Sequence, residues 1–270
     1  MKSRGFMDTE KLDISVVIIT YNEEKNIRRC LEHLGWAREV VVVDSYSTDK
    51  TVEIAREYTD KVVLHAFEGY VKQKNYALDK ATVNWVLSVD ADEVVTPELL
   101  SQIREVWSKD KEMYAGFTVN RRSRFCGKWI GHCGWYPDRK LRLFNRQKGR
   151  WTGDRLHEKI QLEGKIKNLK ADLLHYTYEN LADIVERTQR YSAIFAEAKF
   201  ERGKRTSILD LLFRPVFKFF KAYVLKQGFR DGSHGLILCI CAAHSVFMKY
   251  AKLWELVRRR SERQGRKTES

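Results

Sequence analysis

The stretch WVLSVDADE, residues Trp85–Glu93, joins a short apolar segment directly to a cluster of carboxylates. Its apolar residues are typical of a buried parallel strand. Asp90 is then expected at the carboxyl end of this strand, and Asp92 in the loop that follows. Thr96 is expected to cap the next helix. Ligands bind at this edge of open α/β sheets, where an Asp-x-Asp pair can hold Mg²⁺ or Mn²⁺ with a substrate diphosphate. A solvated acidic turn is the alternative interpretation.

Three further apolar segments precede this one, and helical patterns separate them. The alternation of strand and helix predicts a doubly wound, mostly parallel α/β sheet over about residues 12–120. The predicted strands are Ile14–Ile19, Glu39–Val43, Val62–Leu64 and Trp85–Val89. The first predicted helix ends near Leu34, the second spans Asp49–Tyr58 with Thr48 as its cap, and the third spans Tyr70–Ala81.

Polar or acidic residues follow three of these strands. They are Thr20–Glu23, Asp44 and Asp90–Asp92. Because the carboxyl ends of parallel strands meet at one edge, these residues should converge on one cleft. The chain has neither the G-x-G-x-x-G fingerprint nor the P-loop pattern, so a dinucleotide fold and a P-loop nucleotidase are not indicated. A carboxylate such as Asp44 can instead accept hydrogen bonds from a base or from ribose.

Four ordered motifs carry a resemblance to a known family. They are Val17–Glu23, Val42–Thr51, Lys72–Ala77 and Asp90–Glu93. Together they resemble the family 2 glycosyltransferases, which have a GT-A fold. Ser45 stands where the family usually has a second acid.

The resemblance implies a site for a nucleotide-sugar and a divalent cation, Mg²⁺ or Mn²⁺. It implies that Asp44 contacts the base, that Lys74 lies near the nucleotide and that Asp92 is the metal ligand. Asp90 is implied near the ribose or the metal. The loop residues Thr20, Tyr21, Asn22, Glu23 and Ser47 complete the predicted donor site. His175 is a further candidate for the metal or the diphosphate, with a hydrogen-bonded core histidine as the alternative.

A catalytic base is predicted after the donor motifs. Inverting transfer needs a group that takes the proton of the acceptor hydroxyl. Several relatives end this region in His-Glu, which by resemblance makes Glu158 the base. Asp154 is the competing candidate, and a surface salt bridge is the alternative role for Glu158. No Gln-x-x-Arg-Trp motif occurs, so the processive polysaccharide synthases of the family are not favoured.

Positive charge is concentrated in two segments. Residues 121–150 carry 10 basic side chains and 1 acidic one, and residues 199–270 carry 17 and 6, a net charge of +11. The first segment is interpreted as an acceptor groove for a phosphorylated sugar, with a solvated basic face as the alternative. A nucleic-acid partner is not favoured, because no nucleic-acid-binding motif is present, although an RNA-binding tail remains the alternative for the last residues.

The C-terminal part reads as helical and membrane-associated. Asn180 can cap a helix to about Arg202, and Ile208–Lys226 combines apolar residues with a stripe of cations, as interfacial helices do. Gly235–Met248 is apolar but, at 14 residues, too short to span a bilayer. The predicted division is a catalytic domain, residues 1–178, with a donor half (12–112) and an acceptor half (113–178), followed by a basic membrane-associating region, residues 179–270.

Over its whole length the chain resembles the family 2 enzymes that add β-glucose to an inner-core heptose of lipopolysaccharide. This implies UDP-glucose as donor, a lipopolysaccharide core acceptor and a peripheral position on the cytoplasmic face of a bacterial inner membrane. The odd number of cysteines, five, also favours a reducing compartment. Transfer to a polyprenyl-phosphate, a sugar-nucleotide nucleotidyltransferase and a non-catalytic membrane adaptor are the alternatives.

Overall fold

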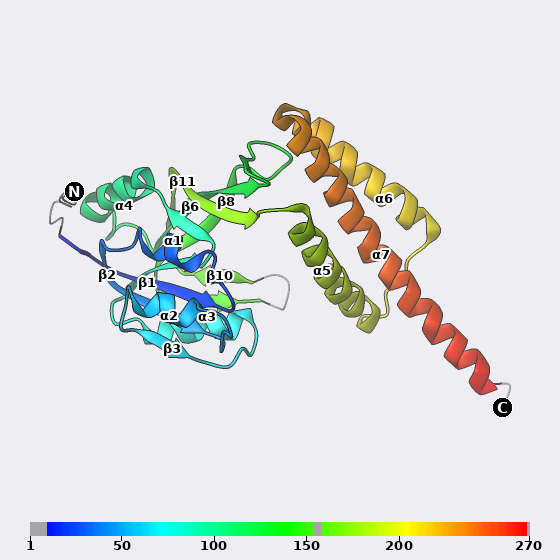
Figure 1. The fold of residues 1–270 in the computed structure, drawn as a ribbon, viewed down its shortest axis with the longest axis horizontal. Coiled ribbons are helices and arrows are strands. Elements are labelled where there is room, and N and C mark those ends of the chain that lie inside the picture. Colours follow the sequence, from blue (N-terminus) through cyan, green and yellow to red (C-terminus); the bar gives the residue numbers. More distant parts are fainter. Residues whose placement is uncertain (1–9, 154–157, 269–270) are drawn as a thin grey trace. The chain divides into compact units, whose positions relative to one another are not determined.

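A computed structural model describes residues 10–153 and 158–268 (Figure 1). The chain divides into two compact units. Unit 1 contains the residues up to Arg122 together with Asp138–Tyr176, and unit 2 contains Ser123–Pro137 together with the residues from Thr177 onward. The segment Ser123–Pro137, which the sequence assigned to the acceptor half, therefore belongs with the C-terminal helices.

Unit 1 is built on a sheet whose first four strands are parallel and lie in the order β3-β2-β1-β4. This order, with helices between the strands, confirms the predicted α/β class. The strands are β1 (Leu12–Thr20), β2 (Ala37–Asp44), β3 (Val62–Leu64) and β4 (Trp85–Asp90).

The sheet continues beyond β4 in the order β8-β6-β11-β5. The pairs β4–β8, β6–β8 and β11–β5 are antiparallel, so this half of the sheet differs from the parallel half. Its strands are β5 (Glu93–Val95), β6 (Gly116–Phe125), β8 (Asp138–Asn145) and β11 (Ile166–Tyr178), and a separate ribbon pairs β9 (Gly149–Thr152) with β10 (Lys159–Leu162). The ends of β6 and β11 extend into unit 2, where β7 (Lys128–Trp129) pairs with β6.

Helices cover both faces of the parallel strands. The helices of unit 1 are α1 (Ile27–Leu31), α2 (Thr51–Arg56), α3 (Tyr70–Lys80) and α4 (Pro97–Lys109). Alternate residues of β1 pack on opposite sides: Ile14, Val16 and Ile18 belong to the core cluster that contains residues of α1, α2 and α4, whereas Val17 packs in the cluster that contains α3. Burial on both faces explains why the centre of this strand, Val16–Ile19, is an uninterrupted apolar run.

Two predicted helix caps have different outcomes. Thr96 caps α4 as expected, because its side chain accepts a hydrogen bond from the backbone N–H of Leu99. The prediction that Thr48 caps the second helix is wrong. The cap position is Lys50, and the side chain of Asp49 accepts the backbone N–H of Thr51 instead.

Unit 2 is helical apart from β7 and the strand ends. It contains α5 (Leu181–Glu201), α6 (Ile208–Phe220), a π-helical turn η1 (Lys221–Leu225), a 3₁₀ turn η2 (Gly228–Asp231) and α7 (Gly232–Thr268). Capping boxes formed by Asn180 with Asp183 and by Ser207 with Asp210 start α5 and α6. The predicted apolar segment Gly235–Met248 is part of the much longer α7.

One segment in the described part of the chain, Gly228–Arg260, is long and apolar enough to cross a membrane by length and composition. The prediction that this region is too short to span is therefore wrong. A single segment of this kind is weak evidence for a membrane span.

Candidate active site

The loops after β1 and β2 are joined through Asp44. This residue is fully buried, and its carboxylate accepts hydrogen bonds from the Thr20 hydroxyl (2.8 Å) and from the Ser47 backbone N–H (2.7 Å). The Ser47 hydroxyl also donates to it. Asp44 thus holds the loop that follows β2 in shape. Its predicted contact with a nucleotide base stays a prediction.

Asn22 connects the same two loops from the other side. It adopts a positive φ of 55°, its backbone N–H donates to the Ser47 hydroxyl (2.8 Å), and its side-chain oxygen accepts the N–H of Thr48 (2.9 Å). Tyr21 and Tyr46, beside these connections, are 58% and 57% exposed. The two rings offer exposed aromatic surface at the predicted donor site; Tyr46 was not predicted as a site residue, and its only sequence signal is its place after Asp44.

The third acidic site lies at the same edge. β1 pairs in parallel with both β2 and β4 and brings Ile19 opposite Asp90, so the side chains predicted to converge after these three strands lie at one edge of the sheet. Burial raises the pKa of Glu23 above its usual value, and the carboxylates of Asp92 and Asp90 raise it further, against a hydrogen bond from Asn26 that lowers it.

Two buried cations hold Asp90. One carboxylate oxygen lies 2.7 Å from a guanidinium nitrogen of Arg142, and the other lies 3.6 Å from Lys74 Nζ. Burial by itself raises the pKa of Asp90, but Arg142 and Lys74 outweigh it, and the pKa falls well below the usual range. Asp90 is therefore an ionised carboxylate already bound by protein cations.

Arg142 also binds Glu93. The Arg142 residue is 3% exposed and Glu93 is fully buried, and Glu93 accepts the backbone N–H of Asp90 (3.0 Å). Burial raises the pKa of Glu93, although Arg142 opposes the shift. The guanidinium therefore fixes both ends of the turn that presents Asp92. The expectation that Arg142 lines an acceptor groove is wrong, because its side chain is buried under this turn.

Other cations of the same basic segment are also engaged within unit 1. Arg121 pairs with Asp138 (2.7 Å), Arg146 donates to the carbonyl oxygen of Val83 (2.9 Å), and Arg150 pairs with Asp79 (2.9 Å). The basic stretch is thus partly a set of internal contacts between strands and loops.

Replacing Arg142 by Met is expected to destabilise unit 1 by about 3–5 kcal/mol, because it removes the nearest cation from the fully buried Glu93 and leaves Asp90 with Lys74 alone. The matched variant Arg150→Met removes an ion pair whose side chains are 52% and 54% exposed, and such pairs contribute about 0–1 kcal/mol. Urea denaturation followed by tryptophan fluorescence measures both. Equal losses in the two variants would contradict the role of Arg142.

Asp92 lies beside His175. The Asp92 carboxylate oxygen and His175 Nε2 are 3.2 Å apart, with side chains 23% and 8% exposed. β11 places His175 opposite Glu93, and the Tyr176 N–H donates to the Asp92 carbonyl oxygen (2.9 Å). The predicted metal residues Asp92 and His175 are thus adjacent, and the His175 ring is one of the contacts of the Asp92 carboxylate.

The Asp92 carboxylate and the His175 imidazole fit a divalent cation that has few protein ligands. The distance of 3.2 Å between the Asp92 oxygen and His175 Nε2 suits two ligands of one cation. Among residues 10–153 and 158–268 there is no group of three or more His, Cys, Asp or Glu side chains able to hold a metal. Mg²⁺ and Mn²⁺ commonly take the rest of their shell from waters and phosphate oxygens, so a site of this kind is complete only with the diphosphate of a donor.

Lys74 joins Asp90 to Glu158. The Lys74 residue is 7% exposed, and its ammonium lies 3.5 Å from a Glu158 carboxylate oxygen and 4.3 Å from the ring centroid of Trp151. The side chain of Asn75 bonds both the N–H and the carbonyl oxygen of Trp151 and so ties α3 to β9. Lys74 thus holds Glu158 near Asp90. The role of Glu158 as a base stays a prediction, and the competing candidate Asp154 lies outside the described residues.

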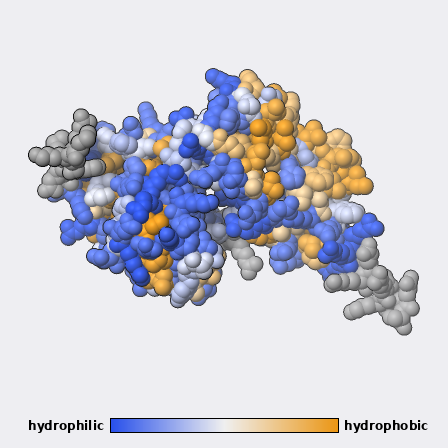
Figure 2. Space-filling view, in the orientation of Figure 1, coloured by the Kyte–Doolittle hydropathy of each residue, from blue (hydrophilic) through white to orange (hydrophobic). Residues whose placement is uncertain are grey.

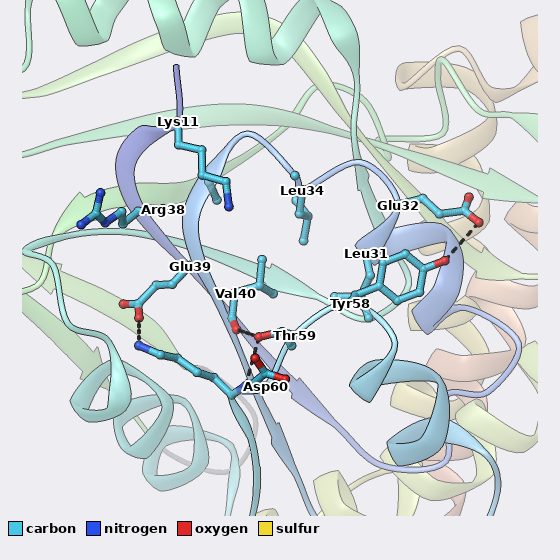
Figure 3. Close-up of a pocket in the computed structure, with 13 residues that line it drawn as sticks. Lys11, Leu31, Glu32, Leu34, Arg38, Glu39, Val40, Tyr58, Thr59 and Asp60 are labelled. Carbon is cyan, nitrogen blue, oxygen red and sulfur yellow. Dashed lines mark hydrogen bonds and ion pairs between the residues drawn. The ribbon is translucent and has the colours of Figure 1, made fainter. Parts of the chain in front are cut away.

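A cavity of about 380 Å³ lies elsewhere in unit 1 (Figure 3). Its lining includes Lys11, Arg38, Glu39 and Lys61, from the starts of β1 and β2 and the loop before β3. This is the amino end of the parallel strands, opposite the edge that carries Asp44 and Asp90. Among the residues that the structure describes, no predicted site residue lines this cavity.

Comparisons with known proteins agree on one family. Residues 15–161 match the model described as glycosyl transferase family 2. The chain is 31% identical over 257 residues to a lipopolysaccharide core biosynthesis glycosyltransferase, LpsC, of Rhizobium meliloti, covering 91% of this chain and 93% of that protein. It is 30% identical to an uncharacterised glycosyltransferase of Rickettsia typhi, covering 90% and 87%.

Solved structures give weaker matches. TarS of S. aureus (residues 1–349) in complex with UDP-GlcNAc has a TM-score of 0.46 and 16% identity, with 92% of each chain covered. Glucosyl-3-phosphoglycerate synthase of Mycobacterium tuberculosis with Mn²⁺ and UDP-glucose has a TM-score of 0.35 and 22% identity, with 42% of this chain and 44% of that chain covered.

Proposed function

This chain belongs to glycosyl transferase family 2, and we propose that it is an inverting enzyme that transfers glucose from UDP-glucose to a heptose of the lipopolysaccharide inner core. It is a glycosyltransferase by its family, which decides against a nucleotidyltransferase and a non-catalytic adaptor. Two contacts at one sheet edge support the proposal. Asp92 lies beside His175, and Glu158 lies beside Lys74.

In the proposed reaction the acceptor hydroxyl oxygen forms a bond to the anomeric carbon of the donor while the bond from that carbon to the diphosphate breaks. Glu158 takes the hydroxyl proton at its carboxylate, and the nucleoside diphosphate departs with the bonding electrons. Lys74 holds Glu158 beside Asp90 and presents a cation close to where the diphosphate would lie. Attack from the face opposite the leaving group inverts the anomeric centre.

Asp92 and His175 would hold the divalent cation, Mg²⁺ or Mn²⁺. The cation, when bound, stabilises negative charge on the departing diphosphate. Arg142 binds Asp90 and Glu93, and Lys74 also lies beside Asp90, so the carboxylate left for the cation is that of Asp92. The other predicted donor residues, Thr20–Glu23, Asp44 and Ser47, shape the loops around this point.

The acceptor in this proposal is an anionic, lipid-linked saccharide at the cytoplasmic face of the bacterial inner membrane. Its support is the similarity to a lipopolysaccharide core enzyme along 91% of this chain, together with the net positive charge of residues 199–270. Transfer to a polyprenyl-phosphate is the second candidate. This candidate predicts a membrane-spanning segment, and Gly228–Arg260 is long and apolar enough to be one by length and composition.

Core oligosaccharide from a strain that lacks the gene is expected to lose one hexose at an inner-core heptose, as mass spectrometry would measure. Purified protein incubated with heptose-containing acceptor should turn over UDP-glucose in preference to UDP-GlcNAc and GDP-mannose, and NMR of the product should show a β-linkage. An unchanged core, with glucose transferred to polyprenyl-phosphate, would favour the second candidate. An α-linked product would contradict the inverting mechanism.

A further inference from the structure

α6 exposes a broad apolar side. None of its residues is buried, although ten of its thirteen are large apolar residues or proline. Seven of them recur at the spacing of a single helix side, and their exposed fractions lie between 48% and 67%: Ile208, Leu209, Leu212, Phe213, Val216, Phe217 and Phe220. These seven residues are called the α6 apolar face below.

The remaining residues of α6 make contacts within unit 2 or carry charge. Leu211, Pro215 and Phe219 follow one another at intervals of four and are partly covered, and Phe219 packs in a cluster with residues of α7. Arg214 pairs with Asp210 and lies over the ring of Tyr250 in α7. Lys218 lies on a third side, which Lys221 of η1 extends. The residues of the α6 apolar face therefore remain exposed within unit 2.

The apolar surface continues beyond α6 within unit 2. Val224 and Leu225 of η1 and Ile240 of α7 are 44%, 59% and 52% exposed. Figure 2 shows hydrophobic side chains gathered over this part of the helical unit. Soluble monomers seldom expose a contiguous apolar patch larger than a few hundred Å², and larger patches mark interaction sites.

We propose that the α6 apolar face lies in the interface of an anionic lipid bilayer, with α6 parallel to the membrane plane. A helix of 13 residues is about 20 Å long, shorter than the roughly 30 Å of hydrocarbon that a spanning helix crosses. The apolar side enters the boundary of the acyl chains, and the cationic side stays at the level of the headgroups. This inference rests on the proposed function, because membrane binding would bring the enzyme to its lipid-linked acceptor.

Charge favours an anionic lipid surface over a second copy of the chain. Residues 199–270 have a net charge of +11, and Lys218 and Lys221 border the apolar face. Two such surfaces brought together would place cations against cations, which is unfavourable. Anionic headgroups instead attract each basic residue near the surface.

Vesicle flotation of the full chain tests the inference without donor or acceptor. The protein should float with vesicles of phosphatidylcholine and phosphatidylglycerol, and less with phosphatidylcholine alone. Phe213→Ser/Phe217→Ser should lower the partition coefficient for both vesicles by about tenfold or more. Lys218→Gln/Lys221→Gln should lower it by roughly tenfold for anionic vesicles only, and about 1 M salt should have the same effect.

Matched variants in unit 1 serve as controls. Met113 and Ile166 are 60% and 47% exposed, so Met113→Ser/Ile166→Ser removes comparable apolar surface and should leave flotation unchanged. Circular dichroism checks that each variant is folded, and the lysine variant keeps the test decisive if the phenylalanine variant is not.

Three outcomes would overturn the inference. The first is negligible flotation of the wild-type chain with either vesicle. The second is a dimer in light scattering that Phe213→Ser/Phe217→Ser dissolves, which would assign the face to a second copy. The third is flotation that Phe213→Ser/Phe217→Ser leaves unchanged, which would assign membrane binding to another segment. Because flotation needs no substrate, its failure is distinguishable from a failure of the proposed transfer.

Discussion

Asp92→Asn is expected to abolish sugar transfer while unit 1 stays folded. The Asp92 carboxylate oxygen lies 3.2 Å from His175 Nε2, where the two side chains can share a divalent cation. A neutral amide is a much weaker ligand than a carboxylate for hard cations such as Mg²⁺ and Mn²⁺. Turnover of UDP-glucose measures the loss, and electron paramagnetic resonance of added Mn²⁺ measures whether cation binding is lost with it.

The control for this variant is Asp79→Asn. Asp79 pairs with Arg150 on the surface of unit 1, where its side chain is 54% exposed, and its loss should change neither turnover nor Mn²⁺ binding. His175→Ala should weaken Mn²⁺ binding in the same direction as Asp92→Asn. Near-normal turnover of Asp92→Asn, or full activity of the wild type in EDTA, would show that the metal assignment is wrong.

Glu158→Gln is expected to lower kcat by roughly 10²–10⁴-fold, the usual range for losing general-base help. The Glu158 carboxylate lies 3.5 Å from Lys74 Nζ and is 26% exposed, so it is both positioned and accessible. Gln keeps the size of the side chain but cannot take the acceptor proton. Isothermal titration with UDP should show donor-site affinity close to that of the wild type, and single-turnover kinetics should locate the loss in the chemical step.

Two further variants distinguish the base from its neighbours. Glu163→Gln changes an exposed carboxylate just after β10 and should leave kcat unchanged. Asp154→Asn tests the competing candidate. If Asp154→Asn lowers kcat by the expected factor and Glu158→Gln does not, the base is Asp154.

Short-range patterns in the sequence were enough to predict the parallel half of unit 1. The alternation of strands and helices from Leu12 to Asp90 follows from local periods of hydrophobic residues, and the capped starts of α4 and α5 follow from Thr96 and Asn180. The convergence of acidic residues was also predictable, because parallel strands bring their carboxyl ends to one edge. The α-helical length of α7 was not, since a polar second half concealed its continuity.

Contacts between distant segments were decided by the tertiary structure alone. Arg142 binds Asp90 from 52 residues away because β8 pairs antiparallel with β4, and no local period shows which strand will join the edge of a sheet. Lys74 meets Glu158 across 84 residues, since α3 is tied to β9 through Asn75.

The sequence by itself thus determined which residue types stand at strand ends and which sides of helices are apolar. Only the fold decided the pairing of Asp92 with His175, the burial of Arg142 and the exposure of the α6 apolar face. The physical reason is the distance along the chain over which each interaction acts. Backbone propensity and hydrophobic period act within a few residues, whereas ion pairing and burial depend on which distant surfaces the completed sheet and helices bring together.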